Sequence, residues 1–145
     1  MTHKRINFIC ILTIIVFTGL SYFNSLHNQF IWDDEFLIEK NIFITDIQYL
    51  PKILTGSSTS GFGGNDNFYR PTQGLFYLLI HSIFGKSKPA FHSGNILLHA
   101  LNGILLFFLL LFLFKSKPVA MATSLLWVTH PMHTEAITYI SGTAD

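Results

Sequence analysis

Two long apolar segments, separated by a polar stretch, constrain this chain more than any other feature of its sequence. Residues 6–23 (INFICILTIIVFTGLSYF) and 90–114 (AFHSGNILLHALNGILLFFLLLFLF) contain no Asp, Glu, Lys or Arg. At a rise of about 1.5 Å per residue they reach about 27 and 37 Å, enough to cross the hydrocarbon core of a bilayer. The composition agrees, because only 12% of the residues are charged, against about a quarter in soluble domains. We therefore predict an all-α membrane protein.

A third apolar segment starts at Val119 and meets the polar stretch HPMHTE at residues 130–135. The helix before this stretch would reach only about 17 Å, which is short for a full crossing. We expect the third span to cover residues 119–140 with a kink near Pro131, where proline interrupts helical hydrogen bonding. The first segment has an alternative interpretation as a cleaved signal peptide, although it is long for one and its downstream flank is aromatic.

Basic residues flank the first two of these three transmembrane helices. Lys4 and Arg5 come just before the first span, and Lys115 and Lys117 follow the second. Short basic flanks stay in the cytoplasm. Residues 24–89 then form one extracytoplasmic loop, and the HPMHTE stretch returns to the same outer side.

The outer loop is expected to contain one short helix, between Pro71 and Gly85. Proline suits a first helical turn and glycine a helix end. About 13 residues are too few to cross a bilayer, so this largely apolar helix is expected to lie at the interface. The net charge of +1 carries no nucleic-acid signature. Because the chain has no N-x-Ser/Thr site, we expect a bacterial inner membrane rather than the endoplasmic reticulum.

Two polar motifs in the loop suggest chemistry. The neighbouring acids Asp33 and Asp34 suit a general base that acts beside a membrane-borne substrate; the alternative is a helix cap. In Tyr69-Arg70-Pro71 the arginine suits phosphate, which it binds with two parallel hydrogen bonds. Its alternative partners are lipid headgroups or the two aspartates.

Polar residues also interrupt the apolar segments. His92, Asn95, His99 and Asn102 recur every three or four residues and so share one face of the second span. Such a face usually turns toward the interior of a helix bundle. The four side chains are expected either to hydrogen-bond between helices or, for His92 above all, to contribute to a site.

The stretch HPMHTE resembles a metal-binding motif only loosely, because the H-E-x-x-H order of zinc proteases is missing. We expect no metal site there. Instead, His133 and Glu135 are expected to line the pocket that also receives the acids of the outer loop.

Four stretches together resemble one family: FIWDDEFLIEKN, FYRPTQGLFYLLIHSIFG, AFHSGNILLHALNGILLF and LLWVTHPMHTEAITYISGTAD. They come in the order and with the spacing of the N-terminal membrane part of the TMTC-like proteins. The combination of H-P-x-H-T-E-A, G-x-A-D and Y-R-P carries the resemblance, which extends from about Gln29 onward. The family is similar to the GT-C glycosyltransferases, including protein O-mannosyltransferases, and carries C-terminal tetratricopeptide repeats. Because this chain has no such repeats, we expect an N-terminal fragment that is inactive alone.

The resemblance implies a transferase that moves a mannose-like sugar from a polyprenyl-phosphate donor to a protein hydroxyl. The acidic motif of the family matches Asp33 and Asp34, which would help to deprotonate the acceptor. Chemistry assigns Arg70 to the departing phosphate, and the remaining candidate substrate-binding residues are Tyr69, His92, His133 and Glu135. The need for a divalent metal is left open. The alternative is a non-catalytic membrane component, such as part of a transporter or an assembly subunit, in which the polar face would line a path or an interface.

Overall fold

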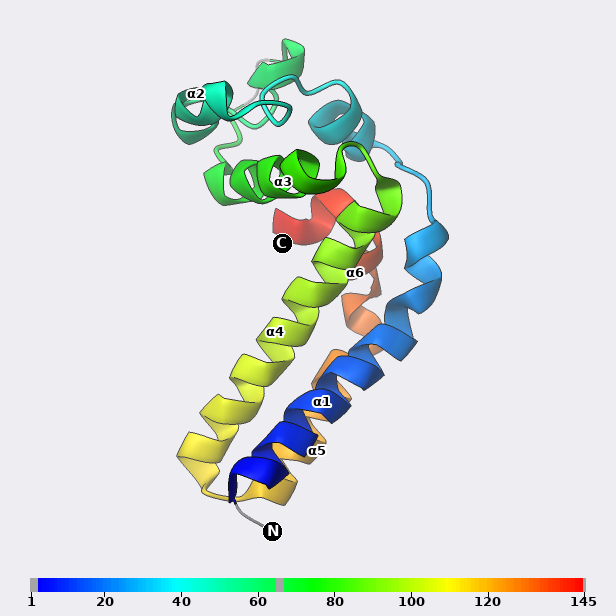
Figure 1. Cartoon of the computed structure of the whole chain (residues 1–145), viewed down its shortest axis with the longest axis vertical. Helices are drawn as coiled ribbons and strands as arrows, with labels where there is room; N and C mark the ends of the chain where they lie inside the picture. Colours follow the sequence, from blue (N-terminus) through cyan, green and yellow to red (C-terminus); the bar gives the residue numbers. More distant parts are fainter. Residues whose placement is uncertain (1–2, 65–66, 145) are drawn as a thin grey trace.

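A bundle of three helices forms one end of the molecule. In the computed structural model, which describes residues 3–64 and 67–144, α1 (His3–Tyr22), α4 (Lys88–Phe114) and α5 (Lys117–Val128) lie side by side. The start of α1 and the α4–α5 turn lie together at the far end of this bundle (Figure 1). Lys115 closes the turn in the left-handed region, at a φ of 53°.

Buried side chains of α1, α4 and α5 form the core of the bundle. Ile14, Phe107, Ala120 and Val128 are each fully buried and pack in one cluster. Gly103 allows the close approach of the helices, because a Cβ atom at this position would lie 2.3 Å from Cγ1 of Val128. Small residues play this part where membrane helices meet, since they let backbones come close.

The two long apolar segments form helices of membrane-spanning length. Arg5–His27, in which η1 (Phe23–His27) continues α1, and Lys88–Phe114 both meet the length and composition expected of a span. Only 22% of the most apolar window of each helix is buried in the molecule, whereas the core helix of a soluble protein is mostly buried. No strand occurs in the described ranges. The prediction of an all-α membrane-type fold is therefore confirmed.

The segment between α1 and α4, residues 28–87, covers the other end of the bundle and is named the cap. It contains η2 (Glu35–Glu39), η3 (Ile47–Tyr49), α2 (Leu50–Thr55), η4 (Ser60–Phe62) and α3 (Pro71–Phe84). The expected helix between Pro71 and Gly85 is confirmed as α3, which lies across the end of α4 (Figure 1). A second core joins this cap to the bundle, and its buried members are Leu37, Ile38, Ile44, Tyr77, Ile80, Phe91 and Ile140.

The third apolar segment is divided at the HPMHTE stretch. After α5 come η5 (Pro131–His133), α6 (Thr134–Thr138) and η6 (Ile140–Ala144). At the break, the Nδ1 atom of His130 accepts the backbone N–H of Met132 (3.2 Å). The short elements turn the chain back under α3, so that η6 lies at the same end of the molecule as the loop acids (Figure 1).

Candidate functional site

The carboxylate of Asp34 is a structural anchor at this end of the molecule. Asp34 is fully buried, and its Oδ1 accepts the backbone N–H (2.8 Å) and the hydroxyl (2.5 Å) of Ser141. Its Oδ2 accepts the N–H of Ile31 (3.3 Å). The Asp34 side chain does not cap the helical turn that follows it, because it makes no capping hydrogen bond to that turn.

Asp33, in contrast, is exposed and held through its backbone. Its N–H donates to the hydroxyl oxygen of Tyr139 (3.3 Å), and the Tyr139 ring packs edge-on against Trp32, with ring centroids 5.9 Å apart. Trp32 adopts a φ of 49°, an uncommon left-handed conformation for a bulky residue. Such backbone strain concentrates at functional sites. The turn buries Asp34 and leaves the carboxylate of Asp33 open to solvent.

Helices α3 and α4 clamp the segment that Asp34 binds. Gln73 donates to the carbonyl of Ser141 (2.9 Å), and Tyr77 donates to the carbonyl of Ile140 (3.0 Å). Asn95 of α4 donates to the carbonyls of residues 137, 139 and 140 at 3.3–3.4 Å. Burial raises the pKa of Tyr77 well above its usual range, so this hydroxyl remains a donor.

Sequence reasoning missed Gln73 and Tyr77 as members of this clamp. One signal was available, because a glutamine in a short and otherwise apolar helix needs a partner if it is buried. Its partner is a backbone carbonyl 68 residues away in the sequence, which no local pattern can identify.

The polar face of the second span mainly makes contacts between helices. His92, Asn95 and His99 are buried, whereas Asn102 is exposed. The Nε2 atom of His99 is 3.1 Å from the carbonyl of Val128 on α5. Asn95 and His99 therefore act as interhelical hydrogen-bonding groups, which is one of the two alternatives expected from the sequence. His92 differs, because neither of its ring nitrogens makes a hydrogen bond to another helix of the described residues.

His133 packs in an aromatic cluster that also contains His99 and Trp127. The ring centroid of His133 is 5.2 Å from that of His99 and 4.6 Å from that of Trp127. Glu135 is exposed on α6. The cavities that Asp33 and Arg70 line contain neither of these two residues in their walls.

Arg70 stands between two cavities. A groove of about 420 Å³ lies between α3, α4 and η6 and is lined by Tyr69, Arg70, Pro71, Thr72, Gln73, Phe76, Leu98 and Thr143. A cleft of about 290 Å³ on the other side contains both Arg70 and Asp33 in its lining. The hydroxyl of Tyr69 donates to the carbonyl of Leu54 (2.6 Å), and this hydrogen bond holds the loop segment just before Arg70 against α2.

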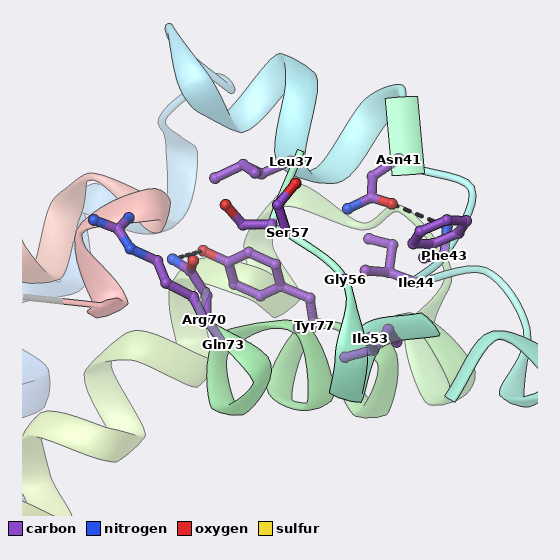
Figure 2. Close-up of a pocket in the computed structure, with 12 residues that line it drawn as sticks. Leu37, Asn41, Phe43, Ile44, Ile53, Gly56, Ser57, Arg70, Gln73 and Tyr77 are labelled. Atoms are coloured by element: carbon purple, nitrogen blue, oxygen red, sulfur yellow. Dashed lines mark hydrogen bonds between the residues drawn. The ribbon is translucent and has the colours of Figure 1, made fainter. Parts of the chain in front are cut away.

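A third hollow is lined by residues of η2, α2 and α3 and also by Arg70, and it is much smaller, about 30 Å³. That is roughly the space of one water molecule. Figure 2 shows the long side chain of Arg70 reaching away from this hollow, while Gln73 and Tyr77 point toward each other and are joined by a hydrogen bond of 2.9 Å. Of the cavities next to Arg70, only the groove and the cleft are therefore large enough to hold a ligand.

Metal ligands do not gather anywhere in the described ranges: no group of three or more His, Cys, Asp or Glu side chains is placed to hold an ion. The charged groups nearest the two cavities are Asp33 and Arg70. The cleft therefore has one carboxylate and one guanidinium in its lining, and the groove has the guanidinium alone.

Comparisons with known proteins identify relatives over most of the chain. It is 33% identical over 134 residues to the human protein O-mannosyl-transferase TMTC1, a match that covers 87% of this chain and 15% of the relative. It is 33% identical over 136 residues to human TMTC2, covering 86% of this chain and 15% of the relative. Tmtc1 of Drosophila melanogaster is 28% identical over 127 residues, with 86% and 15% covered.

The chain thus spans about 15% of the length of the curated relatives it matches. No family model matches the sequence. No solved structure matches it either. Over most of its length, as its sequence motifs predicted, the chain is related to the proteins named TMTC protein O-mannosyl-transferases.

Proposed function

We propose that the chain forms part of a membrane glycosyltransferase that moves a mannose-like sugar from a polyprenyl-phosphate donor to a protein hydroxyl on the extracytoplasmic side. The names of its relatives support a transfer of this kind. The single observation that carries the proposal is the position of Arg70, whose side chain borders both the groove against α4 and the cleft that contains Asp33.

The groove suits the lipid phosphate of the donor. Arg70 offers a positive charge, and Thr72 and Gln73 follow it in the first turn of α3, where backbone N–H groups have no partner inside the helix. No side chain caps this turn. Beyond it, Phe76 and Leu98 provide an apolar wall, and Leu98 belongs to the long apolar helix α4. A prenyl chain leaving the bilayer along α4 would bring its phosphate to Arg70.

Asp33 is the better placed of the two aspartates to act as the general base. Its side chain is exposed in the cleft, whereas both carboxylate oxygens of Asp34 are already engaged with backbone or hydroxyl donors. In the proposed reaction the acceptor oxygen attacks C1 of the sugar with inversion while the bond from C1 to the phosphate oxygen breaks. The hydroxyl proton passes to Asp33, and the bonding electrons pass to the phosphate, whose growing negative charge Arg70 stabilises. Asp34 positions this turn by holding Ser141.

The membrane arrangement is part of the proposal. With the bundle end that carries Lys115 in the cytoplasm, the cap and the HPMHTE stretch emerge together on the outer side. Single cysteines introduced at the exposed positions Glu39, Met132 and Lys115, in a Cys10→Ser background, test this arrangement. A membrane-impermeant thiol reagent should label positions 39 and 132 in intact cells and position 115 only after lysis.

Because the chain alone is expected to be inactive, the catalytic assignment is tested in membranes from cells that express the full open reading frame that contains it. The donor is a labelled prenyl-phosphate mannose and the acceptor contains Ser or Thr. Asp33→Asn should lower transfer by about 10²–10⁴-fold, the usual contribution of a general base. Arg70→Ala should weaken donor binding, and Arg70→Lys should restore part of it because the charge returns. Full activity of Asp33→Asn would remove the base role. A wild-type protein that binds no donor would instead favour a non-catalytic membrane component.

A further inference from the structure

The cleft that contains both Asp33 and Arg70 has a lining that the binding of a phosphate does not require. Its lining consists of Asp33, Phe36, Leu37, Ser58, Thr59, Phe62, Phe68 and Arg70. Three of these residues are phenylalanines, and all eight come from the segment between α1 and α4. The groove on the other side of Arg70, in contrast, includes Leu98 of the apolar helix α4.

Two of the three phenyl rings, those of Phe36 and Phe68, are open to solvent and lie beside charged groups, whereas Phe62 is partly buried. Phe36 is 41% exposed and Phe68 is 61% exposed. The ring centroids of Phe36 and Phe62 are 5.3 Å apart, and the guanidinium carbon of Arg70 lies 5.2 Å from the centroid of Phe68. A concave site with apolar walls and a few polar groups is the usual form of a ligand-binding pocket.

The position of the cleft identifies its occupant. A lipid-linked donor must come from the bilayer, and the groove along α4 offers it a path to Arg70. The acceptor comes from the aqueous side and must bring its hydroxyl to Asp33, which lies in the wall of the cleft. Side chains next to that hydroxyl then fall among the phenyl rings.

We propose that this cleft binds the acceptor polypeptide and takes a large apolar or aromatic side chain adjacent to the hydroxyl-bearing residue. The proposal rests on the proposed function, because Asp33 links the cleft to the reaction. It adds a selectivity: acceptors with phenylalanine or leucine beside the serine or threonine are used better than acceptors with alanine there. A hydrophobic pocket that gains such a side chain discriminates by roughly tenfold to a hundredfold in kcat/KM.

The first test compares acceptor peptides that differ only in this neighbouring residue, with the protein in membranes as expressed from its gene. Wild type should prefer the phenylalanine peptide over the alanine peptide by roughly tenfold or more. Phe36→Ala and Phe68→Ala should each reduce this ratio toward one and leave the KM for the donor unchanged. Phe84→Ala is the matched control, because Phe84 is 60% exposed but lies at the end of α3, outside the cleft lining. A changed donor KM with an unchanged peptide preference would show that the sugar of the donor occupies the cleft and would overturn the proposal.

A second test does not depend on turnover. A peptide carrying benzoyl-phenylalanine next to its serine is photo-cross-linked to the wild-type protein, and the attachment site is mapped. Cross-links to the segment 36–68 are expected, and an excess of the phenylalanine peptide should compete better than the alanine peptide. Cross-links found only in other segments would show that the cleft does not bind the acceptor. This conclusion would hold even if Asp33→Asn abolished transfer. The opposite result is also informative. If the peptide cross-links to the cleft but the Asp33→Asn variant stays fully active, the role of Asp33 as base is rejected and the acceptor cleft is retained.

Discussion

Asp34 and Ser141 are 107 residues apart in the sequence, yet the Oδ1 atom of Asp34 lies 2.8 Å from the backbone nitrogen and 2.5 Å from the hydroxyl of Ser141. This contact joins the turn that presents Asp33 to the segment that α3 and α4 clamp. The exposed candidate base is therefore supported by a buried carboxylate directly next to it in the chain.

Replacing Asp34 should destabilise the protein. Asp34→Ala leaves the N–H and hydroxyl of Ser141 without an acceptor in a buried site, which we expect to cost about 2–4 kcal/mol in the free energy of unfolding. Thermal unfolding followed by circular dichroism in detergent micelles measures the loss. Glu35→Ala is the control, because the ion pair of Glu35 with Lys40 is about half exposed, and such pairs contribute roughly 0–1 kcal/mol. Equal losses in the two variants would contradict the structural role of Asp34.

Tyr139→Phe should affect activity more than stability. The variant keeps the ring that packs on Trp32 and loses the oxygen that accepts the N–H of Asp33. We expect kcat to fall by about tenfold, because a loosely held base is misplaced for proton transfer, with little change in donor KM or melting temperature. Partial burial raises the pKa of Tyr139, so its hydroxyl is protonated near neutrality and the effect should not vary between pH 6 and about 8. Unchanged kcat would show that the turn holds Asp33 without this contact.

Two asparagines of α4 should respond in different ways to the same substitution. Asn95→Leu removes the donor to several carbonyls of the 137–140 segment and the acceptor of the Thr143 hydroxyl (2.7 Å). A loss of about 1–3 kcal/mol is expected, since the carbonyl of Ile137 loses its Asn95 donor in a buried site. The carbonyls of Tyr139 and Ile140 keep donors from Gly142 and Tyr77. Asn102→Leu, on an exposed part of the same helix, should be neutral or stabilising in a detergent or lipid environment. The free energy of unfolding of both variants, measured under identical conditions, tests this prediction. An equal decrease for Asn102→Leu would show that the two asparagines do not differ in their contribution to stability.

Two glycines of the membrane-type helices form a similar pair. At Gly103 a new Cβ would lie 2.3 Å from Cγ1 of Val128 and 3.2 Å from Cγ2 of Ile14, so Gly103→Ala should push the helices apart and cost about 1–3 kcal/mol. At Gly19 nothing lies within 4 Å of the added atom, and Gly19→Ala should stabilise α1 by about 0.5–1 kcal/mol. The melting temperatures of the two variants should therefore move in opposite directions. A lower melting temperature for Gly19→Ala would contradict the open surface that the structure gives this residue.

The sequence by itself determined the helical class, the two long apolar helices and the helix between Pro71 and Gly85. These features depend on residues close together in the chain, where apolar length, proline and glycine act directly on the local backbone. The motifs also identified the relatives correctly, because they are short and keep their order. The periodic placement of His92, Asn95, His99 and Asn102 likewise predicted a shared buried face, since helical spacing sets which side chains share a side. This holds for the first three residues, whereas Asn102 is exposed.

Only the tertiary structure decided what distinguishes Asp33 from Asp34. Two adjacent acids look alike in a sequence, but a left-handed turn at Trp32 directs one into a buried contact with Ser141 and leaves the other in an open cleft. The same holds for Gln73 and Tyr77, whose partners lie more than 60 residues away, and for His133, which joins an aromatic cluster outside the cavities of Asp33 and Arg70. Each of these outcomes depends on contacts between distant segments, and the energy of such contacts exists only once the helices have packed.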